Sequence, residues 1–407
     1  MSDLDPSEQP EQVQQPDLPQ TEESLTDDST PRTSALLQLL NQSGAQRIIQ
    51  TDAPDLGLAE HLPYPFMAVV GQMEMRIALL LSVINPNIGG TLLIGPRGTG
   101  KTTIVRSLAG ILPDVEVSDC EEEVFEEDLQ TEAAEYLYPD CYEKYKAGQP
   151  ISHFEPVKLI ELPLNARLED VVGGINERIA VQRNLVRLEK GILARADRHI
   201  LYIDEVNLLD NHITDAILDA AAQGSYTVRR GAMVGTYRSR FILIGSMNPE
   251  EGRLRPQILD RFGLRVHVRG LTTHEERLEV YQRTQAYRRN PAGFLEQWAL
   301  STEETLVEVL EARQRLKQTI LDDKALNTGL ALIQALEIDS HRADYALFES
   351  ARAYAAADGR TLATLDDVRA VASMALRQRR SEFMSSFLEQ QAQEDQQIQA
   401  ALDRLTS

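Results

Sequence analysis

The feature that most constrains this chain is a glycine-rich stretch between a short apolar run and a helical pattern, TLLIGPRGTGKTTIVRSLAGIL at residues 91–112. Its centre, GPRGTGKT at 95–102, fits the phosphate-loop pattern G-x-x-x-x-G-K-[ST]. A bare match arises by chance, but here a predicted strand precedes it and a predicted helix follows, which is the context that the pattern requires. The stretch therefore predicts a strand–loop–helix unit of an α/β fold.

The residue types of this loop suit the phosphates of a nucleotide. Glycine has no Cβ, so backbone N–H groups can turn inward around an anion, and the following helix points its positive end at the same place. We expect Lys101 to lie near the β- and γ-phosphates and the Thr102 hydroxyl to ligate Mg²⁺. The predicted ligands are therefore ATP and Mg²⁺. The predicted contacts are nine consecutive residues: Gly95, Pro96, Arg97, Gly98, Thr99, Gly100, Lys101, Thr102 and Thr103.

An acidic pair follows a second apolar run. HILYIDEVN at 199–207 brings Asp204 and Glu205 to the end of the predicted strand Ile200–Ile203. In open α/β sheets, ligands bind at the carboxyl ends of parallel strands. We therefore expect Asp204 to hold Mg²⁺ through its water shell and Glu205 to polarise the attacking water.

An amide side chain follows a third apolar run. FILIGSMNPEEG at 241–252 places Asn248 just past the predicted strand Phe241–Gly245. In isolation Asn248 is equally well interpreted as a turn residue before Pro249. Beside the phosphate loop and the acidic pair, the prediction is that its amide holds the attacking water or the γ-phosphate.

Strands and helices alternate through this part of the chain. Val157–Leu162 and Leu264–Val268 are further predicted strands, and Asn211–Gln223 has helical spacing. Continuous apolar strands separated by helices predict a parallel sheet covered on both faces. Residues 226–240, where glycines interrupt extended residues, predict a β-hairpin ahead of the third strand.

After Gly270 the pattern is almost wholly helical and predicts a second, all-α domain. Residues 1–35 hold nine acidic residues, one basic residue and five prolines, so they cannot bury enough surface to offset their chain entropy. Eight carboxylates within residues 116–128 favour a solvated loop over a metal-collecting cluster. The predicted domains are a disordered acidic leader (1–35), an α/β nucleotide-binding domain (36–270), an all-α domain (271–385) and a polar helical tail (386–407). The predicted helices of the all-α domain are Glu275–Gln285, Glu303–Gln318, Asn327–Leu336, Tyr345–Ala357 and Leu365–Arg380.

The charge balance excludes some functions. The formal net charge is −22 at pH 7, and binding to nucleic-acid or membrane phosphates needs clustered Lys and Arg, so neither partner is expected. The sequence has no run of about 18 apolar residues and no signal-peptide pattern, which predicts no membrane span and a cytoplasmic protein. The two cysteines, Cys120 and Cys141, lack metal-ligand spacing and are expected to be reduced thiols.

Together these motifs resemble the AAA+ superfamily and, more narrowly, the ATPase subunit I of magnesium chelatase. The resemblance runs from about Phe66 to Arg380 and is most diagnostic in NPEEGRLRPQILDRFGL at 248–264, which is much longer than generic AAA+ motifs. It implies an AAA+ fold with the all-α lid far from the core, a helix-2 insert at 168–196, and a hexameric ring. The region 118–156 does not match the family well, and Glu349 stands where a basic residue is expected.

Two arginines acquire roles through this resemblance. Arg261, in LRPQILDRFG at 254–263, could by itself be a surface ion-pair partner of Asp260. The family's arginine finger maps onto Arg261, and in a ring such a residue reaches the neighbouring subunit's γ-phosphate. The family's lid arginine maps onto Arg342, which competes with Arg352 and is preferred.

The resemblance implies a motor subunit, whose ATP hydrolysis drives Mg²⁺ insertion into protoporphyrin IX in (bacterio)chlorophyll biosynthesis. The implied partners are further copies of this chain, the integrin-like AAA+ component of the chelatase and its porphyrin-binding component. The alternative is a MoxR-type chaperone that acts with a von Willebrand factor A partner, because both classes share the core motifs. A helicase or DNA-loading motor fits poorly with an acidic chain. The only local basic cluster that could favour it is Arg229, Arg230, Arg238 and Arg240 in the predicted hairpin.

Overall fold

The computed structural model describes residues 63–120, 124–131, 133–175, 188–231 and 233–380, together with positions 396 and 398. The predicted leader 1–35 lies outside the described residues, and so does the predicted tail 386–407 apart from those two positions. The described residues all fall within one structural unit, Leu58–Ser407.

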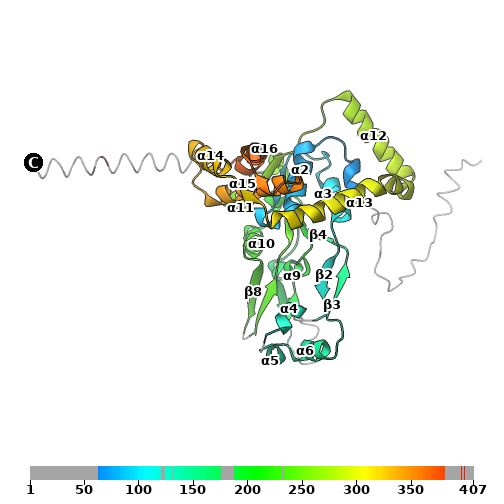
Figure 1. Cartoon of the computed structure of the whole chain (residues 1–407), viewed down its shortest axis with the longest axis vertical. Helices are drawn as coiled ribbons and strands as arrows, with labels where there is room; N and C mark the ends of the chain where they lie inside the picture. The colour runs from blue at the N-terminus through cyan, green and yellow to red at the C-terminus, as the bar shows by residue number, and fades with distance from the viewer. Residues whose placement is uncertain are drawn as a thin grey trace, which may run out of the picture. The chain divides into compact units, whose positions relative to one another are not determined.

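A five-stranded parallel sheet carries the nucleotide motifs (Figure 1). Its spatial order is β11–β1–β10–β7–β4, and all four neighbouring pairs are parallel. The predicted parallel sheet is therefore confirmed, and the order places the ends of β1, β10 and β7 side by side. The strands are β1 (Thr91–Ile94), β4 (Leu159–Leu162), β7 (Ile200–Ile203), β10 (Ile242–Met247) and β11 (Leu264–His267).

Both faces of the sheet are covered, which explains why the strands have continuous apolar runs. All four residues of β1 are buried. Leu93 belongs to an apolar cluster with α2 (Met73–Ile84), whereas Leu92 belongs to a second cluster with α10 (Asn211–Gln223). Burying a Leu side chain stabilises a fold by about 1.5–3 kcal/mol. The two clusters thus fix β1, and with it the start of the phosphate loop, between two helical layers.

The C-terminal region is helical, as predicted, and shares the core of the sheet. One apolar cluster joins Leu79 of α2 and Val266 of β11 to Leu347 and Val371 of the C-terminal helices. The expectation that the lid lies far from the core is wrong, because these helices bury their apolar faces against α2 and β11. The helices are α12 (His274–Arg289), α13 (Pro291–Leu316), α14 (Asp323–Ala335), α15 (His341–Ala357) and α16 (Leu365–Leu376).

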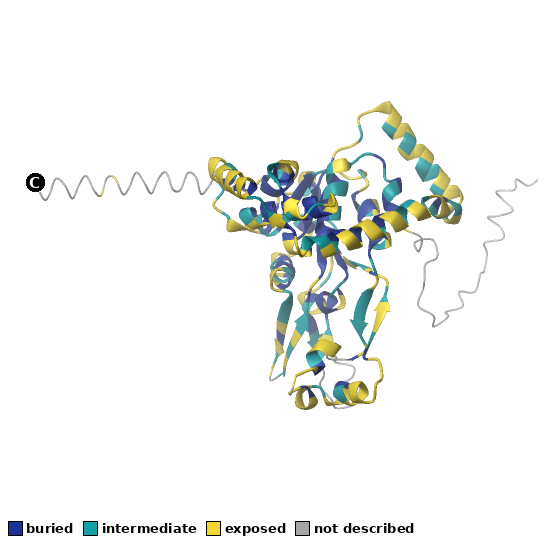
Figure 2. Cartoon of the chain, viewed as in Figure 1, coloured by how far each residue is buried: buried dark blue, intermediate teal, exposed yellow. Residues whose placement is uncertain are grey.

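Two features of this region were not predicted. β12 (Ile320–Leu321) and β13 (Leu362–Ala363) form a parallel pair of two residues each, too short to leave a period-2 pattern. α12 has no buried residue along its whole length (Figure 2). Its contact with the rest of the chain includes Tyr287, whose ring centroid lies 5.3 Å from that of Tyr64 and 5.8 Å from that of Phe294.

The hairpin predicted at 226–240 is confirmed as β8 (Ser225–Arg230) paired antiparallel with β9 (Met233–Arg238). A second ribbon, β2 (Val115–Ser118) with β3 (Ser152–Glu155), flanks three short helices, which we call the helical cap. Arg238 of the hairpin donates hydrogen bonds of 2.6 and 2.7 Å to Asp128 of the cap. The cap helices are α4 (Glu126–Leu129), α5 (Ala134–Leu137) and α6 (Pro139–Lys146).

The prediction of a solvated loop at residues 116–128 is partly wrong. Val124 and Leu129 are buried in a small apolar cluster with both cysteines, which are free thiols. In the sequence, carboxylates stand on both sides of these apolar residues. The apolar residues are also irregularly spaced, so no helix or strand pattern indicated that they are buried. Among the described residues, no group of three or more His, Cys, Asp or Glu side chains could hold a metal ion.

Shorter elements connect these layers. Within the predicted insert, β5 (Gly173–Ile175) pairs antiparallel with β6 (Leu188–Lys190), and the residues between them lie outside those described. No helix in the described part of the chain is both long and apolar enough to cross a membrane. The other elements are η1 (Phe66–Ala68), η2 (Pro86–Ile88), α3 (Lys101–Ser107), η3 (Leu108–Ile111), α7 (Leu168–Val172), α9 (Ile192–Arg195), η4 (Val206–Leu208), η5 (Pro249–Glu251) and α11 (Pro256–Arg261).

Candidate active site

The phosphate loop begins where β1 ends. A Cβ at Gly95 would lie 2.2 Å from the carbonyl oxygen of Val268, which follows β11. Gly100 has φ +84°, in the left-handed region that glycine adopts without a steric cost, and it directly precedes α3. Glycine is therefore needed at one position for close approach and at the other for the turn into the helix.

Lys101 is buried, and its ammonium turns back onto the loop. Its Nζ donates to the carbonyl oxygens of Gly95 and Pro96, both at 2.8 Å. Burial lowers the pKa of Lys101, while the charges of Asp204 and Glu205 act in the opposite direction. Both bonded partners are neutral carbonyls, so a phosphate that enters the loop would gain a charge-assisted contact with this ammonium.

Asp204 follows β7, and hydroxyl groups hold its carboxylate. Its Oδ1 accepts hydrogen bonds from Tyr202 Oη at 2.9 Å and from Ser246 Oγ. Tyr202 Oη also lies 3.2 Å from Thr102 Oγ1, so one polar network joins α3 to β7. Burial raises the pKa of Tyr202 to about 12, and its phenol therefore keeps the proton that it donates.

Glu205 has a strained backbone. Its φ is +51°, in the left-handed region that non-glycine residues rarely adopt, and its N–H donates to Ser246 Oγ at 3.3 Å. Its carboxylate pairs with Arg97 at 2.8 Å, and Arg97 also pairs with Glu251 at 2.6 Å. The hydrogen bond to Glu205 raises the pKa of Arg97. Backbone strain of this kind clusters at functional sites, and here it orients a carboxylate toward the loop.

These side chains surround one cavity of about 320 Å³. Asn248 lines it and is buried, and its Oδ1 also accepts from Glu250 N–H at 3.3 Å, so the turn that was its alternative role is present too. The predicted contacts Gly95 and Pro96 do not line the cavity but accept the hydrogen bonds of Lys101. The lining residues are Arg97, Gly98, Thr99, Gly100, Lys101, Thr102, Thr103, Asp204, Glu205, Ser246 and Asn248.

Neither predicted arginine lines this cavity. Arg261 ends α11 and pairs with Asp219 of α10 at 2.5 Å. Arg342 lies in the first turn of α15 and pairs with Asp260 at 3.5 Å, so Asp260 contacts Arg342 rather than the neighbouring Arg261. The structure therefore does not bring Arg342 to the cavity of its own chain, as a lid contact to the nucleotide would require.

Arg352, the alternative candidate for the lid arginine, has partners outside the cavity. Arg352 pairs with Glu349 at 2.7 Å, and Asn85 donates to the other oxygen of Glu349 at 2.8 Å. The acidic residue at 349 thus links α15 to the end of α2, which gives its unexpected charge a structural reason.

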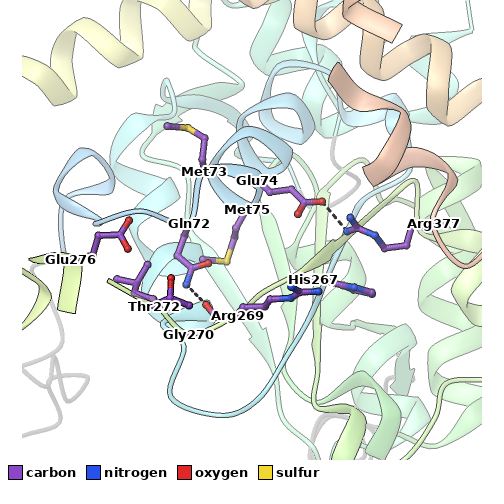
Figure 3. A pocket seen from close by; sticks show the side chains of 11 residues that line it. Gln72, Met73, Glu74, Met75, His267, Arg269, Gly270, Thr272, Glu276 and Arg377 are labelled. Carbon is purple, nitrogen blue, oxygen red and sulfur yellow. Dashed lines mark hydrogen bonds and ion pairs between the residues drawn. The ribbon is translucent and has the colours of Figure 1, made fainter. Parts of the chain in front are cut away.

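A second cavity of about 450 Å³ lies beside the edge strand β11 (Figure 3). Gln72 Nε2 donates to the carbonyl oxygen of Arg269 at 2.7 Å, and Arg377 donates to Glu74 at 2.8 Å on its other side. His267, also in its lining, pairs in register with the last residue of β1. The cavity is therefore lined by a residue of the strand next to β1, the strand that leads into the phosphate loop.

Comparison with known proteins agrees with this geometry. The sequence profile of the ATPase family associated with various cellular activities (AAA) matches residues 91–269, and that of the AAA lid domain matches 327–401. The "Magnesium-chelatase subunit ChlI homolog" of Methanocaldococcus jannaschii is 42% identical over 79% of this chain and 87% of its own. The chain belongs to the family of magnesium-chelatase ATPase subunits.

A second relative agrees with membership of the chelatase family, and one solved structure has a similar fold. The magnesium-chelatase 38 kDa subunit of Rhodobacter capsulatus is 41% identical over 78% of this chain and 87% of its own. The crystal structure of a putative ATPase from Cytophaga hutchinsonii is 19% identical, covers 77% of this chain and 84% of its own, and superimposes with a TM-score of 0.50. At that identity this structural likeness shows the fold alone.

Three residues of this chelatase-family site were not predicted: Tyr202, Ser246 and Glu251. Tyr202 lies two positions before Asp204, and Ser246 lies two positions before Asn248. Alternate residues of a strand share a face, so a polar residue at that spacing was a usable signal. Glu251 follows in the turn after β10, and no pattern indicated that it would meet Arg97.

Proposed function

We propose that this chain is the ATP-hydrolysing motor subunit of magnesium chelatase, which drives Mg²⁺ insertion into protoporphyrin IX in (bacterio)chlorophyll biosynthesis. The observation that carries the proposal is the convergence of Lys101, Asp204 and Glu205 on one cavity, in a chain of the chelatase family. The same family membership favours this function over a MoxR-type chaperone with a von Willebrand factor A partner.

In the proposed reaction the β- and γ-phosphates of ATP lie along the loop. Lys101 leaves the carbonyls of Gly95 and Pro96 to pair with a phosphate, which needs only rotation of a flexible side chain. Glu205 polarises the attacking water once Arg97 releases its carboxylate, and Asn248 orients that water. The 70% exposure of the Arg97 side chain supports this exchange, because an exposed ion pair costs little to break.

Thr102 and Asp204 fit the magnesium ion of ATP. Hydroxyl and carboxylate oxygens are the donors that this hard cation takes. When bound, Mg²⁺ would neutralise charge on the phosphate oxygens. We assign Thr102 as a direct ligand and Asp204 as a ligand through water, with Tyr202 and Ser246 holding Asp204 in place.

We further propose that Arg261 and Arg342 complete the site of the next copy in a ring, as in a hexamer. Both lie outside the lining of their own cavity, and both pair with carboxylates that a phosphate can replace. A guanidinium supplied by a neighbour would neutralise the charge that develops during phosphoryl transfer.

The second cavity is our proposed site for the base and ribose. Its lining includes His267, the strand neighbour of the residue before the phosphate loop, and offers both polar and apolar side chains. Filling it with Thr272→Trp should weaken ATP binding and leave tripolyphosphate binding unchanged, as measured by calorimetry. Equal losses for both ligands would exclude this placement.

Reconstitution tests the biological role. We propose two partners in the cytoplasm, the integrin-like AAA+ component of the chelatase and its porphyrin-binding component. The isolated chain should hydrolyse ATP without inserting metal, and addition of both partners should yield Mg-protoporphyrin IX in an ATP-dependent manner. Glu205→Gln should block the product while the complex stays assembled. If the same mixture makes product equally well without this chain, the chelatase function is wrong and the MoxR-type function replaces it.

A further inference from the structure

One short helix carries the proposed arginine finger and, immediately before it, a carboxylate. Successive residues of an α-helix point about 100° apart. On α11, Arg261 accordingly reaches Asp219 of α10, whereas Asp260 faces the lid helices. The two neighbours in the sequence therefore connect the same helix to different parts of the molecule.

Four side chains converge on Asp260 from the lid and the sheet. Its Oδ2 accepts from Ser340 Oγ at 2.8 Å and from Arg342 at 3.5 Å. Its Oδ1 accepts from Arg379 at 2.9 Å and lies 3.9 Å from a guanidinium nitrogen of Arg265. Asp260 is thus the carboxylate shared by three guanidinium groups.

The three guanidinium groups differ in their freedom to move. The side chains of Arg265 and Arg379 are fully buried and also donate to backbone carbonyls, so they cannot leave. Burial lowers the pKa of both, to about 9 for Arg265. Arg342 is 56% exposed and makes the longest of the hydrogen bonds to Asp260. Of the three, only Arg342 can exchange Asp260 for another anion without leaving a buried guanidinium charge unpaired.

We propose that Asp260 is a positioning residue for both arginines of the shared ATP site. It fixes α11, and with it Arg261, against the lid, and it holds Arg342 until the γ-phosphate of the neighbouring copy draws that side chain away. Ser340 and Arg379 keep Asp260 in place after Arg342 leaves. The inference rests on the proposed function, in which Arg261 and Arg342 act across the subunit boundary.

Mixed rings of the full-length protein provide the test. Lys101→Ala removes the loop half of the site and Arg261→Ala removes the finger half, so a ring containing both retains some boundaries with two intact halves. Asp260→Asn alone should lower kcat for ATP hydrolysis about 10- to 100-fold, because a catalytic group is misplaced. It should regain activity when mixed with Lys101→Ala but not when mixed with Arg261→Ala. Nucleotide affinity, followed with a fluorescent ATP analogue, should stay at the wild-type value.

Two variants accompany this test. Glu337→Gln removes an exposed lid carboxylate that pairs with Arg380 at 2.5 Å and should leave hydrolysis unchanged. Asp260→Glu keeps the charge that the buried guanidinium groups need, so it preserves the fold if Asp260→Asn does not. The longer side chain of Asp260→Glu displaces the carboxylate by one methylene, so kcat should fall. Like Asp260→Asn, this variant should regain activity when mixed with Lys101→Ala but not when mixed with Arg261→Ala.

Each other outcome has a definite meaning. If the Asp260 variants recover activity with Arg261→Ala instead of Lys101→Ala, Asp260 serves the cavity of its own subunit and the inference is wrong. Wild-type kcat in both Asp260 variants also overturns it. If Lys101→Ala and Arg261→Ala fail to recover together despite proven co-assembly, the shared site itself is wrong, and the inference is wrong with it.

Discussion

The phosphate cavity and the surface that carries Arg261 and Arg342 are organised in opposite ways. In the cavity, residues at or just after the ends of β1, β7 and β10 line one space of about 320 Å³, where an ammonium, two carboxylates and an amide meet. On the arginine surface, the side chains point toward carboxylates of their own chain and line neither of the two cavities described above.

This difference supports the proposed division of the catalytic groups between neighbouring copies of the chain. The cavity needs only one chain to form, because adjacent parallel strands end at the same edge of the sheet. The arginine surface holds its cations in ion pairs with Asp219 and Asp260, which in our proposal a second copy exchanges for phosphate. Variants of the two regions should therefore fail in different ways, and the following experiments separate them.

Loss of the loop cation should have the largest effect. Lys101→Ala removes a charge-assisted contact to the phosphates, and we expect ATP affinity to fall about 100-fold or more and hydrolysis to become undetectable. Calorimetric titration measures the affinity. Lys101→Arg is the matched control for charge. Wild-type affinity in Lys101→Ala would show that the cavity is not the phosphate site.

Loss of the water-polarising carboxylate should preserve binding. Glu205→Gln keeps the size of the side chain but removes its basicity, so kcat should fall about 10²- to 10⁴-fold with ATP affinity retained. Steady-state hydrolysis and nucleotide titration measure the two quantities. Hydrolysis at the normal rate would disprove the role of Glu205.

Loss of the proposed finger should depend on assembly. Arg261→Ala should lower kcat about 10³-fold in assembled rings, because a guanidinium no longer reaches the neighbouring phosphate. At dilutions where the chain is monomeric, the variant and the wild type should hydrolyse ATP at the same residual rate. A rate defect that persists in the monomer would mean that Arg261 acts on the cavity of its own chain. The two regions would then not be organised in opposite ways.

Loss of the exposed cation in the cavity should have the smallest effect. Arg97→Gln frees Glu205 and Glu251 from an ion pair that is largely exposed, so kcat should change less than about fivefold. The change should shrink as salt concentration rises, since salt screens exposed charges. A loss comparable to that of Glu205→Gln would mean that Arg97 contacts the phosphates directly.

Much of the cavity could be predicted because its residues follow strands. Ile200–Ile203 forms β7 over its predicted bounds, and Asp204 and Glu205 come directly after it. The same reasoning placed Asn248 after β10, and its burial in the cavity lining agrees with that placement. Prediction was poorest in residues 116–128, where charge in the sequence concealed a small apolar cluster.

The sequence by itself determined the phosphate loop, the acidic pair and the parallel sheet, because each depends on the order of residue types over a few positions. Only the tertiary structure decided which side chains from distant segments contact the phosphate loop, the acidic pair and the sheet. The contact of Arg97 with Glu251 and the convergence of Ser340, Arg342 and Arg379 on Asp260 depend on how separate loops and helices pack. No local pattern specifies such packing, because it follows from burying apolar faces far apart in the chain.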